Sequence, residues 1–387
     1  MVHIFSGDNP TKLYLESLEA VLRTGDDVSP RGKKILEIRP AVFQFTNPLN
    51  RVTFVKGRVI NPFFQLAESL WILSGKSDVA SLLPYNSAMG QFSDNGIDFH
   101  APYGERLRSW NKCSAEGFVF NPLDQLVDVY KKIQADRDTR QAVAVIYNPL
   151  FDNNFIQTVD RPCNMILTFK VRKNKLEMVV FNRSNDLHWG LFGANLCQFS
   201  TIQEVMASWL GLEVGTYTHI TDSLHVYLED YGNSISKEIM ETEQGEFKTS
   251  ILASDTELEP RMTSDFETFH RILQYFEQRV APILLDPKEF LNAWKNALDS
   301  FLTVQDLYLR TVFLSMAAYQ AHKLDMTEAV CSFMSNMPDC QWKISCLRYL
   351  SPKYNPRNTS HHIEFLDIFK YYPQEIKDYI MRTDIKG

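Results

Sequence analysis

RPCN at residues 161–164 and NRSNDLHWG at residues 182–190 bracket two β-rich runs. These runs, residues 167–171 and 176–181, are joined at Lys173-Asn174, and the pattern predicts a β-hairpin. The first motif therefore begins one strand, and the second motif follows the end of the next strand. Chemically active side chains are concentrated at these two strand ends.

Cysteine, arginine and serine give these strand ends a definite chemistry. A thiolate such as that of Cys163 is the strongest side-chain nucleophile near neutral pH, and neighbouring cations lower its pKa. The Arg183-Ser184 pair offers a forked donor and a hydroxyl group, which together suit a phosphate. A nucleophile near a phosphate-binding pair indicates covalent catalysis on a nucleotide. Taken alone, Cys163 would be interpreted as a small buried hydrophobic residue.

The bulk composition describes an ordinary globular protein. The chain has 387 residues, of which 44% are hydrophobic and 22% are charged. This length predicts a core domain plus an extra module. The formal net charge of −7 argues against general affinity for nucleic acid or an anionic membrane. A nucleoside monophosphate needs only a local basic pocket, so it is compatible with this charge.

The cysteines argue against a disulfide framework or a zinc site. The six cysteines lie far apart, and no pair has the C-x-x-C spacing. The N-terminus has no cationic start, and no run approaches the ~18 apolar residues of a membrane span. We therefore expect a cytoplasmic protein without a bound metal.

The order of the predicted elements favours the α+β class. Apolar periodicity predicts helices over residues 11–24, 63–73, 123–133 and 196–210, the last of which ends at Gly211. Apolar alternation predicts strands over residues 35–45 and 142–147, in addition to the hairpin. The elements do not follow a regular βαβ rhythm.

Composition changes near residue 240. Residues 241–262 are predicted to be a linker or mobile loop between a catalytic domain at residues 1–240 and an extension at residues 263–387. We expect the extension to be all-helical, because residues 264–267 match a capping box and residues 288–322 carry helical apolar faces. The extension shows no evident chemistry.

The chain resembles the thymidylate synthase family, which includes the pyrimidine-nucleotide hydroxymethyltransferases. The resemblance spans about residues 20 to 235 and keeps the order of the family's motifs. The positions that carry it are Glu68, Tyr103, Arg140, Cys163, Arg183, Ser184, Asp186, Asn195 and His225-Val226-Tyr227. It implies a thymidylate synthase-like mixed sheet packed with helices, a homodimer, and 5,10-methylenetetrahydrofolate as cosubstrate.

Three of these positions imply catalytic roles. By the resemblance, Cys163 adds to C6 of the pyrimidine ring and makes C5 able to attack the one-carbon unit. Glu68 lies in an apolar helix, where raised proton affinity suits a proton-relay acid. Tyr103 matches the tyrosine associated with removal of the C5 proton. Taken singly, the glutamate could face solvent, and the tyrosine could be a packed aromatic near a turn.

The implied phosphate ligands are Arg31, Arg140, Arg183 and Ser184. The resemblance implies that Arg140 is lent by the partner subunit across the dimer interface. The family usually carries a second arginine next, where this chain has Gln141. Phosphate binding is therefore expected to be weaker or to use further basic residues.

The remaining implied contacts concern the sugar and the folate. His225 and Tyr227 are spaced to face one side of a strand, and they match the pair that holds the 3′-hydroxyl of the sugar. Asp186 matches the carboxylate that binds the pteridine of the folate. Phe92 is the aromatic residue expected near the folate, in a segment where methylating relatives carry tryptophans.

Asn195 is the residue expected to read the pyrimidine edge. The family pattern places an asparagine eleven residues after the phosphate arginine, whereas Asn195 comes one residue later after Arg183. We infer a one-residue insertion in residues 191–194. An amide can match both O4 and N3–H of uracil. Cytosine-acting relatives carry aspartate here, so the asparagine favours dUMP over dCMP.

The sequence leaves the product open between methyl and hydroxymethyl. Both reactions share an exocyclic methylene on C5, and exclusion of water decides whether hydride or water reaches it first. Residues 86–92 lack tryptophan, the chain continues well past Tyr227, and Asn164 stands where histidine is usual. These departures slightly favour hydroxymethylation of dUMP. The alternatives are reductive methylation to dTMP, or hydroxymethylation of dCMP or CMP.

Two further alternatives come from other functional classes. A catalytically inactive family member could act as a binding protein, although retention of Cys163, Glu68 and Tyr103 argues against it. A cysteine hydrolase could pair Cys163 with His225, but no motif for an oxyanion hole supports it.

Overall fold

The computed structural model describes residues 2–110, 122–153, 157–242, 259–354 and 362–381. The chain divides into two compact units, one of Met1–Thr53 with Glu68–Ser236 and the other of Phe54–Ala67 with Lys237–Gly387. Most of the predicted linker, residues 243–258, lies outside the described residues. The domain boundaries at residues 240 and 263 stay a prediction.

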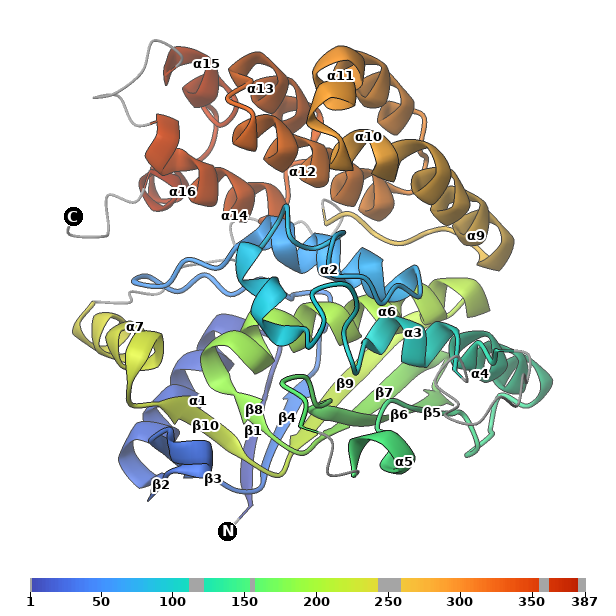
Figure 1. The fold of residues 1–387 in the computed structure, drawn as a ribbon, viewed down its shortest axis with the longest axis vertical. Coiled ribbons are helices and arrows are strands. Elements are labelled where there is room, and N and C mark those ends of the chain that lie inside the picture. Colours follow the sequence, from blue (N-terminus) through green and yellow to red (C-terminus); the bar gives the residue numbers. More distant parts are fainter. Residues whose placement is uncertain (1, 111–121, 154–156, 243–258, 355–361, 382–387) are drawn as a thin grey trace. The chain divides into compact units, whose positions relative to one another are not determined.

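The first unit is built on a six-stranded mixed sheet (Figure 1). Its strands in spatial order are β1 His3–Gly7, β4 Ala41–Phe45, β9 Glu213–Thr221, β7 Lys175–Asn182, β6 Asn164–Arg172 and β5 Val143–Val145. The pairs β1–β4 and β9–β7 are parallel, and the other pairs are antiparallel. A mixed sheet with helices on it confirms the α+β class.

The central hairpin forms as the sequence predicts. β6 and β7 pair antiparallel, and Arg172 faces Lys175 across a two-residue turn. Lys173 and Asn174 have φ values of 50° and 60°, as a type I′ turn requires. The hairpin places Cys163 immediately before β6 and Arg183 immediately after β7, with the Arg183 N–H donating to the Cys163 carbonyl at 2.9 Å.

A second, four-stranded sheet has the order β2 Asp26–Val28, β3 Ile35–Ile38, β10 Leu224–Tyr227 and β8 Asn185–Asp186. The prediction of one strand over residues 35–45 is wrong, because the segment forms β3 in this sheet and β4 in the larger one. Pro40 lies between them, and proline supplies no N–H for a continuous ladder.

Helices of the first unit flank these sheets. They are α1 Pro10–Thr24, the 3₁₀ turns η1 Pro30–Gly32 and η2 Ser87–Phe92, α2 Pro62–Leu73 (shared with the second unit), α3 Tyr103–Arg108, α4 Gln125–Ala135, α5 Pro149–Asp152, the π-helix η3 Leu187–Asn195, and α6 Leu196–Leu210. The apolar helix α6 packs on β7 and β9 and ends at Gly211, whose φ of 63° closes the helix as predicted. These contacts fix α6, and with it the side chains that α6 carries, against the centre of the sheet.

The π-helix η3 spans the residues where the sequence predicts an extra residue before Asn195. The N–H of Leu196 donates to the carbonyl of Leu191, five residues back, instead of four. One π turn holds one residue more than an α turn, so the residues before and after it keep their angular register. The insertion that the sequence predicts in residues 191–194 falls within η3 and stays a prediction.

The remaining elements in the described residues are all helical. Its elements are α7 Asp230–Glu241, α9 Phe266–Tyr275, the π-helix η4 Phe276–Val280, α10 Ala281–Leu285, α11 Pro287–Leu302, α12 Leu307–Lys323, α13 Thr327–Asn336, α14 Gln341–Leu350, the 3₁₀ turn η5 Ser351–Tyr354, α15 His362–Asp367 and α16 Gln374–Ile380. Stacked rings such as Phe276 on Phe313, 4.8 Å apart, form its core. The all-helical extension is confirmed, and none of the helices in the described ranges is long and apolar enough to cross a membrane.

The predicted capping box at residues 264–267 is wrong in detail. Asp265, not Ser264, caps α9 by accepting from the Thr268 N–H at 2.8 Å. Ser264 instead donates its hydroxyl to Asp306 at 2.7 Å, and Asp306 also accepts the Leu309 N–H as the cap of α12. Ser264 therefore ties the start of α9 to the start of α12.

Candidate active site

Cys163 lies immediately before β6, with a partly exposed side chain and a free thiol. Burial raises the pKa of its thiol, and the Arg183 and Arg31 guanidinium groups lower it against the effect of Asp160. The expectation that neighbouring cations favour the thiolate is right for these two arginines. Burial nevertheless outweighs them, so the net pKa is raised.

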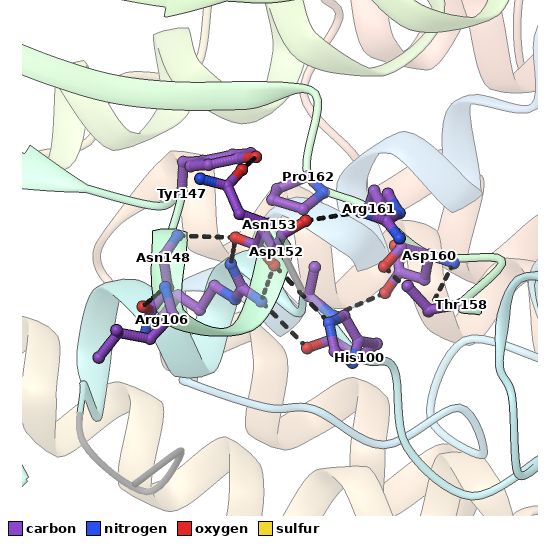
Figure 2. Close-up of polar contacts among 12 residues, drawn as sticks. His100, Arg106, Tyr147, Asn148, Asp152, Asn153, Thr158, Asp160, Arg161 and Pro162 are labelled. Carbon is purple, nitrogen blue, oxygen red and sulfur yellow. Dashed lines mark hydrogen bonds and ion pairs between the residues drawn. The ribbon is translucent and has the colours of Figure 1, made fainter. Parts of the chain in front are cut away.

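A buried ion pair holds the segment before the nucleophile (Figure 2). Arg106 donates to both carboxylate oxygens of Asp152, at 2.6 and 2.9 Å, and both side chains are almost fully buried. Arg161 donates to the backbone carbonyl of Asp152 at 2.6 Å, and Asp160 accepts the Ala101 N–H at 2.8 Å. These contacts attach the residues just before Cys163 to a rigid, forked ion pair.

The Tyr103 hydroxyl lies against the backbone of the nucleophile. Its oxygen accepts from the Cys163 N–H at 3.3 Å, the Asn164 N–H at 3.4 Å and Asn164 Nδ2 at 3.0 Å. Asn182 Nδ2 in turn donates to Asn164 Oδ1 at 2.8 Å. Burial raises the pKa of Tyr103, and the bonds from Asn164 oppose that rise. Asn164 therefore orients the tyrosine.

Arg183 and Ser184 follow β7 beside the nucleophile. The Arg183 Nε donates to the Pro162 carbonyl at 2.9 Å, while the rest of its exposed guanidinium reaches toward the Arg161 carbonyl at 3.3 Å. The Ser184 N–H donates to Asn182 Oδ1 at 2.8 Å. The exposed part of the guanidinium and the serine hydroxyl are the groups that could contact a phosphate.

His225, Tyr227 and Asp186 meet in the small sheet. His225 lies opposite Asp186 in the parallel β8–β10 pair, and the His225 and Tyr227 rings are 5.3 Å apart on one face. Burial lowers the pKa of His225, while Asp186 raises it. Asp186 also caps η3 by accepting the N–H groups of His188 and Trp189 at 3.0 and 3.3 Å. Arg31 in η1 lowers the pKa of Tyr227 and so belongs to the same electrostatic group.

Glu68 is connected to Asn195 through one side chain. Gln198 Nε2 donates to Glu68 Oε2 at 2.6 Å, and Asn195 Nδ2 donates to Gln198 Oε1 at 3.0 Å. Burial raises the pKa of Glu68 to about 7, and the bond from Gln198 opposes that rise. The Phe199 ring beside Gln198 lies 6.2 Å from the Tyr103 ring. The side chains expected to read the base and to relay protons thus lie together.

Two predicted residues are not brought to this group. Arg140 is exposed in the turn before β5, and across the described ranges no hydrogen bond or ion pair joins it to the other candidate residues. Phe92 ends η2 and is 38% exposed. Asp94 nearby accepts the Val159 N–H at 3.0 Å, so the segment that carries Phe92 is tied to the residues preceding Cys163.

Sequence reasoning missed three buried polar residues behind Asn195. They are Gln198, Asn185 and His219, and each takes part in a hydrogen bond of this group. Gln198 could have been found from its position one helical turn after Asn195. His219 gave no such signal, because its strand joins the site only in the folded sheet. Among the residues that the structure describes, no cluster of histidine, cysteine and carboxylate side chains could hold a metal.

Comparison with known proteins identifies similar chains. The family model described as thymidylate synthase matches residues 12–276. A deoxyuridylate hydroxymethyltransferase of Bacillus phage SP01 is 51% identical over 362 residues, covering 91% of this chain and 94% of the phage protein. A protein of the same name from Pseudomonas phage M6 is 35% identical over 57% of this chain and 59% of its own length. A putative thymidylate synthase of Methanosarcina barkeri is 33% identical over 36% of this chain and 58% of its own length.

Proposed function

Because the chain belongs to the thymidylate synthase family, we propose that it transfers a one-carbon unit from methylenetetrahydrofolate to C5 of dUMP. The product is 5-hydroxymethyl-dUMP. Methylenetetrahydrofolate, dUMP and water react to give this product and tetrahydrofolate, so the equation balances. The observation that carries the proposal is the hydrogen-bonded chain from Asn195 through Gln198 to Glu68, which neighbours Tyr103 through Phe199. Base recognition and proton transfer are served by one connected group.

Cys163 supplies the covalent step. Its Sγ forms a bond to C6, which makes C5 nucleophilic towards the one-carbon unit, and the same bond breaks when the product is released. The raised pKa of the thiol means that a proton must leave it before attack. Arg183 and Arg31 favour the thiolate, so two of the four groups proposed to hold the phosphate also assist the nucleophile.

Tyr103 and Glu68 serve the proton transfers. Three N–H groups point at the Tyr103 oxygen, and they would stabilise negative charge as it develops there during removal of the C5 proton. Glu68, with a pKa of about 7, can hold or release a proton at physiological pH. Tyr103 therefore acts at C5, and Glu68 acts at the polar edge of the ring.

The remaining residues position the substrates. Ser184 joins Arg183 at the phosphate, and Arg140 of a second subunit completes that site in a homodimer. His225 and Tyr227, whose rings share one face, bind the sugar hydroxyl. Asp186, which accepts the N–H groups of His188 and Trp189 at the start of η3, binds the pteridine of the folate. Phe92, exposed at the end of η2, contacts the folate.

Reductive methylation to dTMP is the second candidate. The proposal for hydroxymethylation is supported by the extent of similarity to the phage SP01 protein, which is named a deoxyuridylate hydroxymethyltransferase. Residues 86–92 are also consistent with it, because they hold Phe92 and no tryptophan to shield the methylene from water.

The test is to incubate the purified protein with methylenetetrahydrofolate and dUMP, dCMP or CMP and to identify products by mass. A gain of CH2O on dUMP with release of tetrahydrofolate is the expected result. A gain of CH2 with release of dihydrofolate would establish the methylating alternative. No product from any nucleotide, in a protein that still binds dUMP, would favour the inactive binding protein.

A further inference from the structure

Asn195 cannot choose between uracil and cytosine by itself. Uracil presents an acceptor at O4 and a donor at N3, whereas cytosine presents a donor at N4 and an acceptor at N3. A carboxamide carries one acceptor oxygen and one donor nitrogen, and a half-turn of the amide exchanges them. One orientation of Asn195 therefore matches uracil, and the reverse orientation matches cytosine. The contacts that fix the orientation of the Asn195 amide therefore determine which of the two bases binds.

One end of the Asn195 amide is fixed through Gln198. An ionised Glu68 can only accept hydrogen bonds, so it turns Gln198 Nε2 towards itself at 2.6 Å. Gln198 Oε1 must then face Asn195, where it accepts from Nδ2 at 3.0 Å. The donor end of the Asn195 amide is thereby assigned.

The other end is fixed through Asn185 and His219. Asn185 Nδ2 donates both of its N–H groups, one to Asn195 Oδ1 at 3.2 Å and one to His219 Nε2 at 2.8 Å. Burial lowers the pKa of His219 to about 3, so the ring is neutral and one nitrogen is an acceptor. His219 Nδ1 therefore carries the proton and donates it to the Tyr217 oxygen at 2.7 Å.

The shape of the site keeps Asn185 in place. Its Oδ1 is buried and has no hydrogen-bond partner among the described residues. A Cβ on Gly190 would lie 2.5 Å from that oxygen, so any larger residue at position 190 would displace the Asn185 amide from this position. Both N–H groups of Asn185 consequently point towards Asn195 and His219.

These contacts leave Asn195 with one N–H and one lone pair unused. We propose that Asn185 and His219 are positioning residues that lock Asn195 in the orientation that reads uracil and rejects cytosine. The inference rests on the proposed function, in which Asn195 binds the pyrimidine. It assigns base specificity to the residues behind Asn195 as well as to Asn195 itself.

Asn185→Asp tests the lock with little change in volume. A carboxylate accepts only, so it draws Asn195 Nδ2 towards itself and turns the amide to its cytosine-reading orientation. Gln198 must then also turn, and a protonated Glu68 can donate to it, so the effect should be larger below pH 7. At pH 6 the kcat/KM for dCMP relative to dUMP should rise about tenfold or more, as a reversed bidentate contact requires.

Asn182→Asp is the matched control, because Asn182 is also buried and bonds to Asn164 and Ser184 but not to Asn195. It should lower turnover of both nucleotides and leave their ratio unchanged. In an Asn195→Ala background, Asn185→Asp should also leave the ratio unchanged, because the side chain through which it acts is gone.

Asn185→Leu provides a second test of the same contact in case the aspartate variant does not fold. It removes the donor to Asn195 Oδ1 without adding charge, so discrimination against dCMP should weaken. Dissociation constants for dUMP and dCMP, measured by calorimetry, give a readout separate from turnover. An unchanged ratio in folded Asn185→Asp or Asn185→Leu, with a wild type that acts on dUMP, would overturn this inference alone. A wild type that neither binds nor converts dUMP would overturn it together with the proposed function.

Discussion

A carboxyl group on an apolar helix needs a partner, and Glu68 finds it in Gln198 at 2.6 Å. One hydrogen bond does not replace full hydration, so the pKa stays raised at about 7. Cys163 shows the same balance, since two arginines favour its thiolate and burial opposes them. At the residue scale, burial therefore raises the pKa of both the acid and the nucleophile, and Glu68 exchanges its proton near neutral pH.

Glu68→Gln tests this balance through activity. We expect kcat to fall about 100-fold or more, as loss of a proton-transfer group does. The wild-type pH profile should show a limb near pH 7 that the variant lacks. A profile that keeps this limb in the variant would assign the titration to another group.

The same substitution has a signed effect on stability. Wild-type Glu68 loses its proton at about pH 4.5 when unfolded and about pH 7 when folded, so its contribution to stability is lost as the pH rises through this window. Glu68→Gln should therefore become more stable than wild type above pH 7, by about 3 kcal/mol at most, and equal to it near pH 4.5. Urea denaturation at pH 5 and pH 8 measures this, and no difference between the two pH values would contradict it.

At the scale of elements, the π-helix η3 offers a way to accommodate one extra residue. The sequence predicts an insertion in residues 191–194 by counting from Arg183, and the bond from the Leu196 N–H to the Leu191 carbonyl spans the same residues. An α-helix would have rotated Asn195 by about 100° for each added residue. The π turn instead keeps Asn195 beside Asn185 and Gln198.

Deletion of Gly193 tests this interpretation. The π turn should relax to an α turn, and Asn195 should keep its register and its affinity for dUMP within about tenfold. Deletion of buried Ala207, in the regular part of α6, is the control and should unfold the protein, because it rotates the rest of the helix. Loss of dUMP binding as complete as in Asn195→Ala would show that η3 does not absorb the extra residue.

The β6–β7 turn offers a prediction of stability at the same scale. Lys173 has a φ of 50°, a conformation that a side chain makes unfavourable. Lys173→Gly should raise the free energy of unfolding by about 0.5–1 kcal/mol without changing activity. Lys175→Gly, in the strand beside it, should lower the free energy of unfolding. A decrease for both variants would show that the turn conformation is not the limiting factor.

At the scale of the whole molecule, Arg140 is the predicted residue that no contact ties to the site of its own chain within the described ranges. The proposed homodimer, in which Arg140 is lent to the partner subunit, would account for this. Mixing Arg140→Ala with Cys163→Ser should then restore activity, because each mixed dimer contains one site with both native residues. Random pairing predicts about a quarter of wild-type activity after subunit exchange. Each variant alone should stay inactive, and no recovery in the mixture would argue for a site made within one chain.

The sequence by itself determined the local structure and the chemical identity of the site. The hairpin turn at Lys173-Asn174, the stop of α6 at Gly211 and the helical extension follow from short-range patterns, and all three are confirmed. The prediction of one strand over residues 35–45 is wrong because apolar alternation does not show which sheet a strand joins. The segment is interrupted at Pro40, and its two halves belong to two different sheets.

Only the tertiary structure decided how the site is held. Asn185, Gln198 and His219 come from β8, α6 and β9, and their hydrogen bonds form because the two sheets and α6 bring distant segments together. The pKa of Glu68 likewise depends on burial by residues far from it in sequence. A motif can name the side chains that do the chemistry, whereas their orientation and their protonation depend on neighbours that the motif does not contain.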